Sequence, residues 1–90
     1  MNKKKKDSKY KIVVLQRGWV VVGKFLKEKE YGILENAAVI RRWGTTKGLP
    51  ELVNGPLPET ILDKSQTPIR FHELTSIMIL DCGDKWSSVL

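Results

Sequence analysis

The sequence is poor in the residues that cross-link or catalyse in small proteins: of its 90 residues, one is cysteine and one is histidine. Cys82 alone excludes an internal disulfide, and no cluster of Cys and His suggests a structural metal. Any mechanism of the Ser/His/Asp or Cys/His type would have to use His72. We therefore expect no cofactor, no metal and no enzymatic activity.

Long apolar runs are also missing. No segment approaches the roughly 18 consecutive apolar residues that span a bilayer. The N-terminal lysines are not followed by the apolar stretch and small-residue cleavage site of a secretory signal. A lone cysteine agrees with a reducing compartment. We expect a cytoplasmic protein without a membrane partner.

The net charge of +6 is unevenly placed along the chain. Residues 1–9 carry five lysines and one aspartate, whereas residues 10–90 carry 11 basic and 9 acidic side chains, which leaves +2. Because a lysine run cannot bury apolar surface, residues 1–9 are predicted to be a disordered basic tail and residues 10–90 one small domain. The nearly balanced body makes nucleic acid a possible partner but a less favoured one.

Apolar and β-branched residues predict strands in the first half of the chain. Residues 10–16 and 19–26 are expected to form a hairpin around Gly18, with Gly23 as a bulge. The nearly continuous apolar character of this hairpin predicts burial on both faces, with Trp19 in the core.

After a polar tip, residues 31–43 resume the β pattern. A helix over residues 34–41 is the alternative, because Asn36, Ala37 and Ala38 have low β propensity.

The second half alternates turn signals with short apolar segments. Pro50 and Gly55 suit the beginning and the end of a short helix. Residues 60–63 and 69–72 are predicted strands, and residues 76–81 are predicted to be a buried one. The fold class that follows is mostly β: a small single-domain barrel or sandwich of five or six short strands with one short helix.

Small size predicts self-association. A domain of this length buries only about 60% of its unfolded surface, and neither a disulfide nor a metal is available to compensate. We therefore expect a homo-oligomer, with Trp86, near the C-terminus, packed across the interface between subunits.

One segment concentrates groups that suit a small phosphorylated, nucleotide-like ligand: Arg41, Arg42, Trp43, Gly44, Thr45, Thr46, Lys47, Gly48 and Leu49. Arginine offers bidentate hydrogen bonds to phosphate, and an indole offers a stacking face for a base. Glycines let backbone N–H groups approach an anion as a nest. The hypothesis places the ligand on Arg41, Arg42, Trp43, Thr45, Thr46 and Lys47, with Arg70 and His72 as further contacts.

Plainer interpretations stay open. The segment lacks the order of a P-loop, and a strand that ends in a solvated arginine pair and a Gly/Thr turn would explain it equally well. Cys82 could be a nucleophile beside Asp81 and Asp84, but it follows a predicted buried strand and is more simply a small core residue. Likewise, His72 could be an ordinary surface residue.

The chain resembles a family of small uncharacterised domains found in phage and prophage genomes. The likeness covers nearly all of residues 11–82 and is carried by residues 11–23, by residues 36–49 with Asn54, Gly55 and Pro56, and by residues 70–74. The resemblance implies no activity, but it implies a setting in the cytosol of a bacterial host.

In that setting the chain is similar to phage anti-defence proteins that act as sponges. Such proteins sequester cyclic oligonucleotides or cyclic ADP-ribose derivatives without cleaving them. The resemblance therefore implies sequestration of a nucleotide-derived immune signal. The alternatives are a module that binds nucleic acid, one that inhibits a host protein, and a structural role in assembly.

Overall fold

The computed structural model describes residues 9–90, so the predicted disordered tail falls, except for Lys9, outside the described residues. Lys9 itself belongs to the fold, because its carbonyl accepts a hydrogen bond of 2.7 Å from the N–H of Phe25. None of the helices in residues 9–90 is long and apolar enough to cross a membrane.

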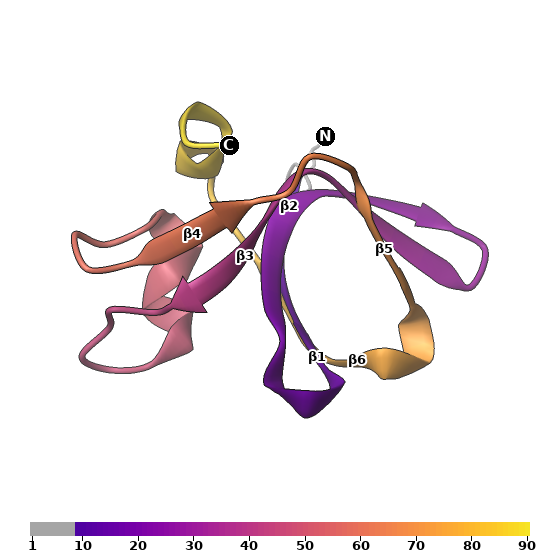
Figure 1. Ribbon diagram of the computed structural model, residues 1–90, viewed down its shortest axis with the longest axis horizontal. Helices are drawn as coiled ribbons and strands as arrows, with labels where there is room; N and C mark the ends of the chain where they lie inside the picture. Colours follow the sequence, from indigo (N-terminus) through magenta and orange to yellow (C-terminus); the bar gives the residue numbers. More distant parts are fainter. Residues whose placement is uncertain (1–8) are drawn as a thin grey trace, which may run out of the picture.

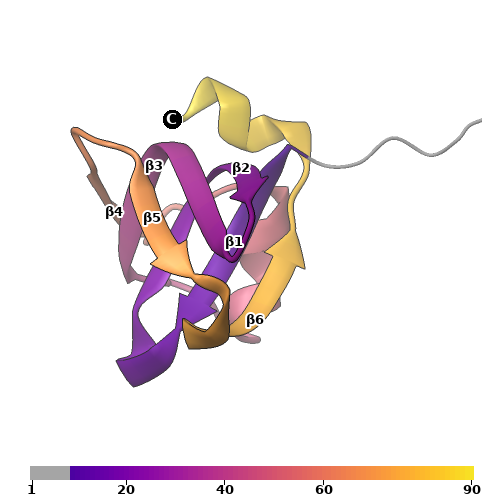
Figure 2. The ribbon, with the colours of Figure 1, turned by 90° about the vertical axis from the view of Figure 1, so that its right-hand side faces the viewer.

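Six strands form one antiparallel sheet (Figure 1): β1 (Tyr10–Leu15), β2 (Val20–Glu28), β3 (Tyr31–Arg42), β4 (Ile61–Lys64), β5 (Ile69–His72) and β6 (Ser76–Asp81). The strand order is β4-β3-β2-β1-β6, and β5 pairs with the first part of β3. Within residues 9–90 no pairing joins β5 to β6, so the curled sheet stays open (Figure 2). The mostly β prediction is confirmed.

Four short 3-10 helices connect these strands: η1 (Gln16–Gly18), η2 (Leu49–Asn54), η3 (Glu73–Thr75) and η4 (Asp84–Ser88). The predicted short helix is η2, which has Pro50 in its first turn and ends before Gly55. The φ of Gly55 is +116°, a value that residues other than glycine rarely adopt. Proline and glycine therefore set both ends of η2 in the predicted way.

The central strands separate two apolar clusters, as their unbroken apolar sequence predicted. Because successive side chains point to opposite faces of a strand, Ile12 joins one cluster and Val13 the other. The larger cluster is covered by η2 and η4 and contains Leu52 and Trp86. The smaller cluster lies on the opposite face and includes Phe71 from β5.

A bulge in β3 redirects its side chains between these clusters. Val22 pairs with Ala38 whereas Lys24 pairs with Glu35, so two residues of β3 oppose the single Gly23 of β2. The extra residue lies at Asn36, whose φ is +49°. The bulge was predicted at Gly23, and it lies there on the partner strand. Residues 31–42 form one strand, so the alternative of a helix over 34–41 is wrong.

Three predictions about burial are wrong. Trp19, expected in the core, is 57% exposed because it lies at the tip of the β1–β2 hairpin. Strand β6, expected to be buried, exposes Ile77, Met78 and Ile79 because it is an edge strand. Trp86, expected at a subunit interface, is fully buried within the subunit, where its Nε1–H donates to the Leu52 carbonyl at 2.8 Å.

The pairing of β3 with β5 leads to a test at Gly32, which lies opposite Phe71. An added Cβ at Gly32 would overlap the Phe71 ring. Gly32→Ala should therefore lower the free energy of unfolding by about 1–3 kcal/mol, the usual cost of overpacking. Gly83→Ala is the matched control, because Gly83 has φ −80° and its nearest atoms would lie 3.8 Å from the new Cβ. Urea unfolding that shows equal stability for both variants would contradict this packing.

Candidate functional site

The predicted ligand-binding residues fall into two separate groups. Arg41 and Arg42 lie at the C-terminal end of β3 and lead into the loop over residues 43–48. Arg70 and His72 lie on β5, which pairs with the first residues of β3. Because β3 is 12 residues long, these groups lie toward opposite ends of the sheet. One small ligand therefore does not touch both groups in this arrangement.

In the loop over residues 43–48, where a nest for a phosphate was predicted, backbone N–H groups donate to a carboxylate of the protein. The N–H and Oγ1 of Thr46 donate to the Glu51 carboxylate at 3.3 Å and 3.2 Å, and the Lys47 N–H donates to the same group. Glu51 lies in the first turn of η2, so the negative charge is near the N-terminus of that helix. Thr45 is half-buried in the same loop. Glu51 thus satisfies the N–H groups that were expected to meet a phosphate.

The two adjacent arginines have different carboxylate partners, and a register shift between Ile40 and Arg42 interrupts the regular alternation of β3 at this point. Arg41 Nε donates to Asp63 Oδ2 on β4 at 2.9 Å. The Arg42 guanidinium lies 3.8 Å from Glu59. All four side chains are at least half exposed, so these ion pairs are screened and exchangeable. An anionic ligand could replace either carboxylate at small cost.

Arg70 and His72 also have partners in the protein. Arg70 lies 3.0 Å from Glu28, and its guanidinium carbon lies 5.8 Å from the centre of the Tyr31 ring. His72 Nδ1 accepts the Leu74 N–H at 3.1 Å, so its imidazole caps the short helix η3. The Arg70 contacts hold the β2–β3 hairpin against β5, and the His72 contact orders the turn that follows β5, so both residues have a structural role.

A different set of residues forms the groove nearest to the predicted arginines. This open groove has a volume of about 440 Å³, within the range of small-molecule sites, and it is lined by Arg17, Gly18, Trp19, Val20, Val39, Ile40, Arg41 and Asp63. Its lining combines two arginines, one aspartate and an exposed tryptophan with three apolar residues. Of the predicted site residues, only Arg41 lines it.

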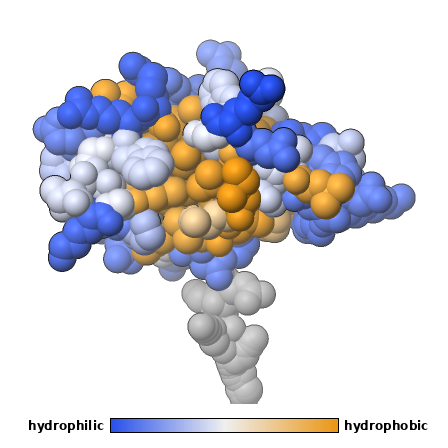
Figure 3. Space-filling view, turned by 90° about the horizontal axis from the view of Figure 1, so that it is seen from below, coloured by the Kyte–Doolittle hydropathy of each residue, from blue (hydrophilic) through white to orange (hydrophobic). Residues whose placement is uncertain are grey.

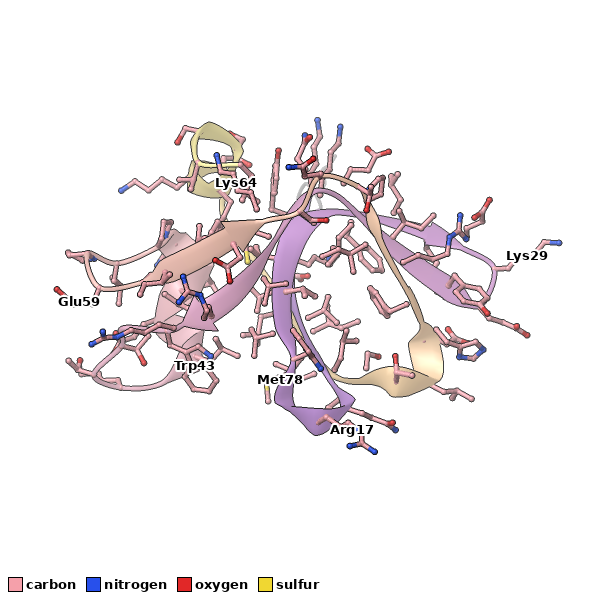
Figure 4. All side chains as sticks on the ribbon, viewed as in Figure 1. Arg17, Lys29, Trp43, Glu59, Lys64 and Met78 are labelled. Atoms are coloured by element: carbon pink, nitrogen blue, oxygen red, sulfur yellow. The ribbon has the colours of Figure 1, made fainter. Side chains whose placement is uncertain are left out.

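Trp19 and Arg17 were missed because both lie at a hairpin tip. Trp19 follows a turn and begins an apolar run, a pattern typical of a core residue. Arg17 has φ +68°, a conformation that non-glycine residues adopt at tight turns. Figure 4 shows Arg17 on this hairpin and Trp43 on a different loop, beyond the end of β3. The signal available in the sequence was the turn at Arg17 and Gly18 directly before an aromatic residue.

Cys82 is buried, and burial raises the pKa of its thiol to about 11. At neutral pH the thiol is therefore protonated and shielded, which is a poor state for a nucleophile. Within residues 9–90 no group of three or more His, Cys, Asp and Glu side chains could hold a metal ion.

Comparison with known proteins adds no constraint to this geometry. No protein-family model matches the chain, and no curated protein matches it. The resemblance to phage domains therefore stays a prediction.

The filled nest leads to a test with an inorganic anion. Glu51→Ala should free the N–H groups of Thr46 and Lys47, so that phosphate raises the thermal midpoint of this variant through linked binding. The wild type should respond much less. Glu35→Ala is the control, because it removes the same charge from β3 without touching the loop. Both proteins are compared at 50 mM phosphate, a concentration on the order of the dissociation constant expected for a weak anion site. Equal responses of wild type and Glu51→Ala would show that the loop is not a nest.

The raised thiol pKa predicts a fall in stability at alkaline pH. The unfolded chain loses the Cys82 proton near pH 9 and the folded chain near pH 11, so the free energy of unfolding decreases as the pH rises through this interval. Replacing Cys82 by alanine should reduce the slope of this decrease. Denaturant titrations at pH 8 to 11 measure the slope, and an unchanged slope in the variant would contradict the assignment.

Proposed function

We propose that this protein is a non-catalytic binding module for a small phosphorylated, nucleotide-like ligand. The observation that carries the proposal is the groove that Trp19 lines together with Arg17 and Arg41. A base can stack on the exposed indole, and arginine can bind phosphate with two parallel hydrogen bonds. The setting implied by the phage resemblance makes a cyclic oligonucleotide or cyclic ADP-ribose derivative in the bacterial cytosol the expected ligand class.

The charges of the groove support binding of an anion. Within residues 9–90 no carboxylate lies within ion-pair distance of Arg17, whereas Arg41 is held by Asp63. A phosphate would therefore meet one guanidinium directly and displace Asp63 from the other. The displaced carboxylate could then accept a hydrogen bond from a ribose hydroxyl or a base amino group. The one carboxylate that lines the groove, Asp63, is held by Arg41 at 2.9 Å and has no histidine or thiol beside it among the lining residues, which supports sequestration rather than hydrolysis.

Nucleic acid has less support as a ligand. Five Lys and Arg side chains of residues 9–90 form ion pairs with carboxylates, and these include Lys27 with Glu73 and Arg42 with Glu59. A protein that tracks a phosphate backbone needs a continuous basic face with several stacking residues. A host-protein target and the predicted homo-oligomer remain parts of the proposal, and both require an exposed apolar surface.

The site is tested with cyclic di-AMP and cyclic ADP-ribose as probes in isothermal titration calorimetry. Arg17→Ala and Arg41→Ala should each weaken binding by about 1.5–3 kcal/mol, the range for hydrogen bonds to charged groups. Trp19→Ala should weaken binding through the loss of base stacking. It should keep the fold, since most of the indole is exposed. Binding that persists in 0.5 M salt would separate a small ligand from nucleic acid, whose affinity falls steeply with salt.

Trp43→Ala is the matched control, because Trp43 is also partly exposed but does not line the groove. It should bind normally. Loss of binding in Trp43→Ala with normal binding in Trp19→Ala would instead place the ligand on the loop over residues 43–48. Recovery of a hydrolysed probe after heat denaturation of the complex would overturn the non-catalytic assignment, and failure of both probes to bind would reject this ligand class.

A further inference from the structure

Strand β6 has one open edge. The Cys82 N–H donates to the Tyr10 carbonyl at 2.9 Å, so by the alternation of an antiparallel ladder Met78 and Leu80 also bond to β1. The N–H and C=O of Ile79 then point to the opposite side. Ile77 is the extra residue at the register shift between Val14 and Leu15, so it does not pair with β1. Among the described strands, none pairs with this side of β6.

The side chains along this edge are large, apolar and exposed. Ile77, Met78 and Ile79 are 64%, 47% and 44% exposed, and Leu74 just before the strand is 78% exposed. Figure 3 shows a continuous apolar area at the centre of the face seen from below, and Figure 4 places Met78 on this lower side. A monomer that exposes three consecutive apolar residues on a strand edge is at risk of pairing with other chains.

The charges around the edge favour pairing of β6 with β6 of a second copy. Residues 76–80 contain no charged residue and no proline, the two devices that usually protect an edge strand. The nearest charges on β1 and η3 are already compensated, by the ion pairs of Lys11 with Asp81 and of Lys27 with Glu73. Arg17, which has no ion-pair partner among residues 9–90, lies at the hairpin tip beyond Leu15 and outside residues 77–79, so two copies can approach along these residues without like charges at the contact.

We propose that β6 pairs antiparallel with β6 of a second copy, about a twofold axis that passes by Met78. This inference gives the homo-oligomer of the proposed function an interface. A twofold axis perpendicular to the joined sheet places the same face of both copies on the same side. Because the side chains of two paired residues lie on one face, the two residue numbers must both be odd or both be even. The register with Met78 opposite itself pairs Ile77 with Ile79 of the partner subunit. A shift by two residues would instead place Ile77 opposite Asp81 of the partner subunit, an unfavourable pair.

A cavity beside Ile79 supports a second copy as the occupant. This cavity of about 440 Å³ lies on the side where the sheet stays open, and its apolar lining includes Phe25, Phe71 and Leu74. In the proposed register, Ile77 of the partner subunit stands next to Ile79 on the same face and covers the cavity rim. The N-terminal residues 1–8 are a poor alternative occupant, because four of them are lysines.

Cysteine cross-linking tests the register. Residues at a non-hydrogen-bonded antiparallel pair have Cα atoms about 4.5 Å apart, within the range that a disulfide can join. Met78→Cys should therefore form a covalent dimer under mild oxidation, while the wild type should not, because its only cysteine is buried. Ile77→Cys mixed with Ile79→Cys should link, and Ile77→Cys alone should link far less. Efficient linking of Ile77→Cys alone, or none at Met78→Cys, would overturn the register.

Sedimentation velocity tests the interface itself. The wild type should be a dimer at micromolar concentration and Met78→Lys a folded monomer, whereas Leu26→Lys, at a residue of similar exposure on β2, should stay dimeric. A monomeric wild type, or a dimeric Met78→Lys protein, would overturn the proposal and leave the edge for a different protein. Because no residue of β6 lines the Trp19 groove, titration of Met78→Lys with cyclic di-AMP separates failure of this interface from failure of the ligand site.

Discussion

The bulge of β3 opposite Gly23 is the constraint on which the rest of the molecule depends. A small sheet that buries both faces needs its central strands to supply apolar side chains in both directions. Here Leu34 faces the smaller cluster while Ala38, four residues later, faces the larger one. Strict alternation would put both on the same face, so one inserted residue is required. The same break lets the two parts of β3 pair with β5 and β4 separately.

Binding of the basic loop and of Arg41 by carboxylates of the same chain is the second organising feature. The residues that most resemble a phosphate site in the sequence are engaged by nearby carboxylates: Glu51 fills the loop over residues 43–48, and Asp63 holds Arg41. Glu51 follows this loop in sequence and lies in the first turn of η2, so its role is local. Asp63 reaches Arg41 only because β4 pairs with β3. An affinity for an external anion inferred from the sequence motif alone is therefore too high, because the motif does not show the carboxylates that already bind it.

The two proposed surfaces both arise where apolar residues meet an edge or a turn. Trp19 and Ile79 belong to segments whose apolar sequences indicate burial, yet one lies at a hairpin tip and the other on an edge strand. Exposure of such residues costs solvation free energy, about 25 cal/mol per Å² of apolar surface. A bound ligand over Trp19 and a second β6 strand beside Ile79 would recover part of it. These surfaces lie on different residues and can be occupied together.

The sequence by itself determined the strands, the short helix between Pro50 and Gly55, and the alternation that puts Phe71 inward, because backbone preference and side-chain period are local properties. It also marked Arg41 as a candidate ligand contact. Only the tertiary structure decided which strand became the edge, that Trp86 closes the core of its own subunit, and that Arg41 lies beside Trp19 and Arg17 instead of Arg70 and His72. Strand order and register join residues far apart in the chain, and no local pattern encodes which pairs will meet.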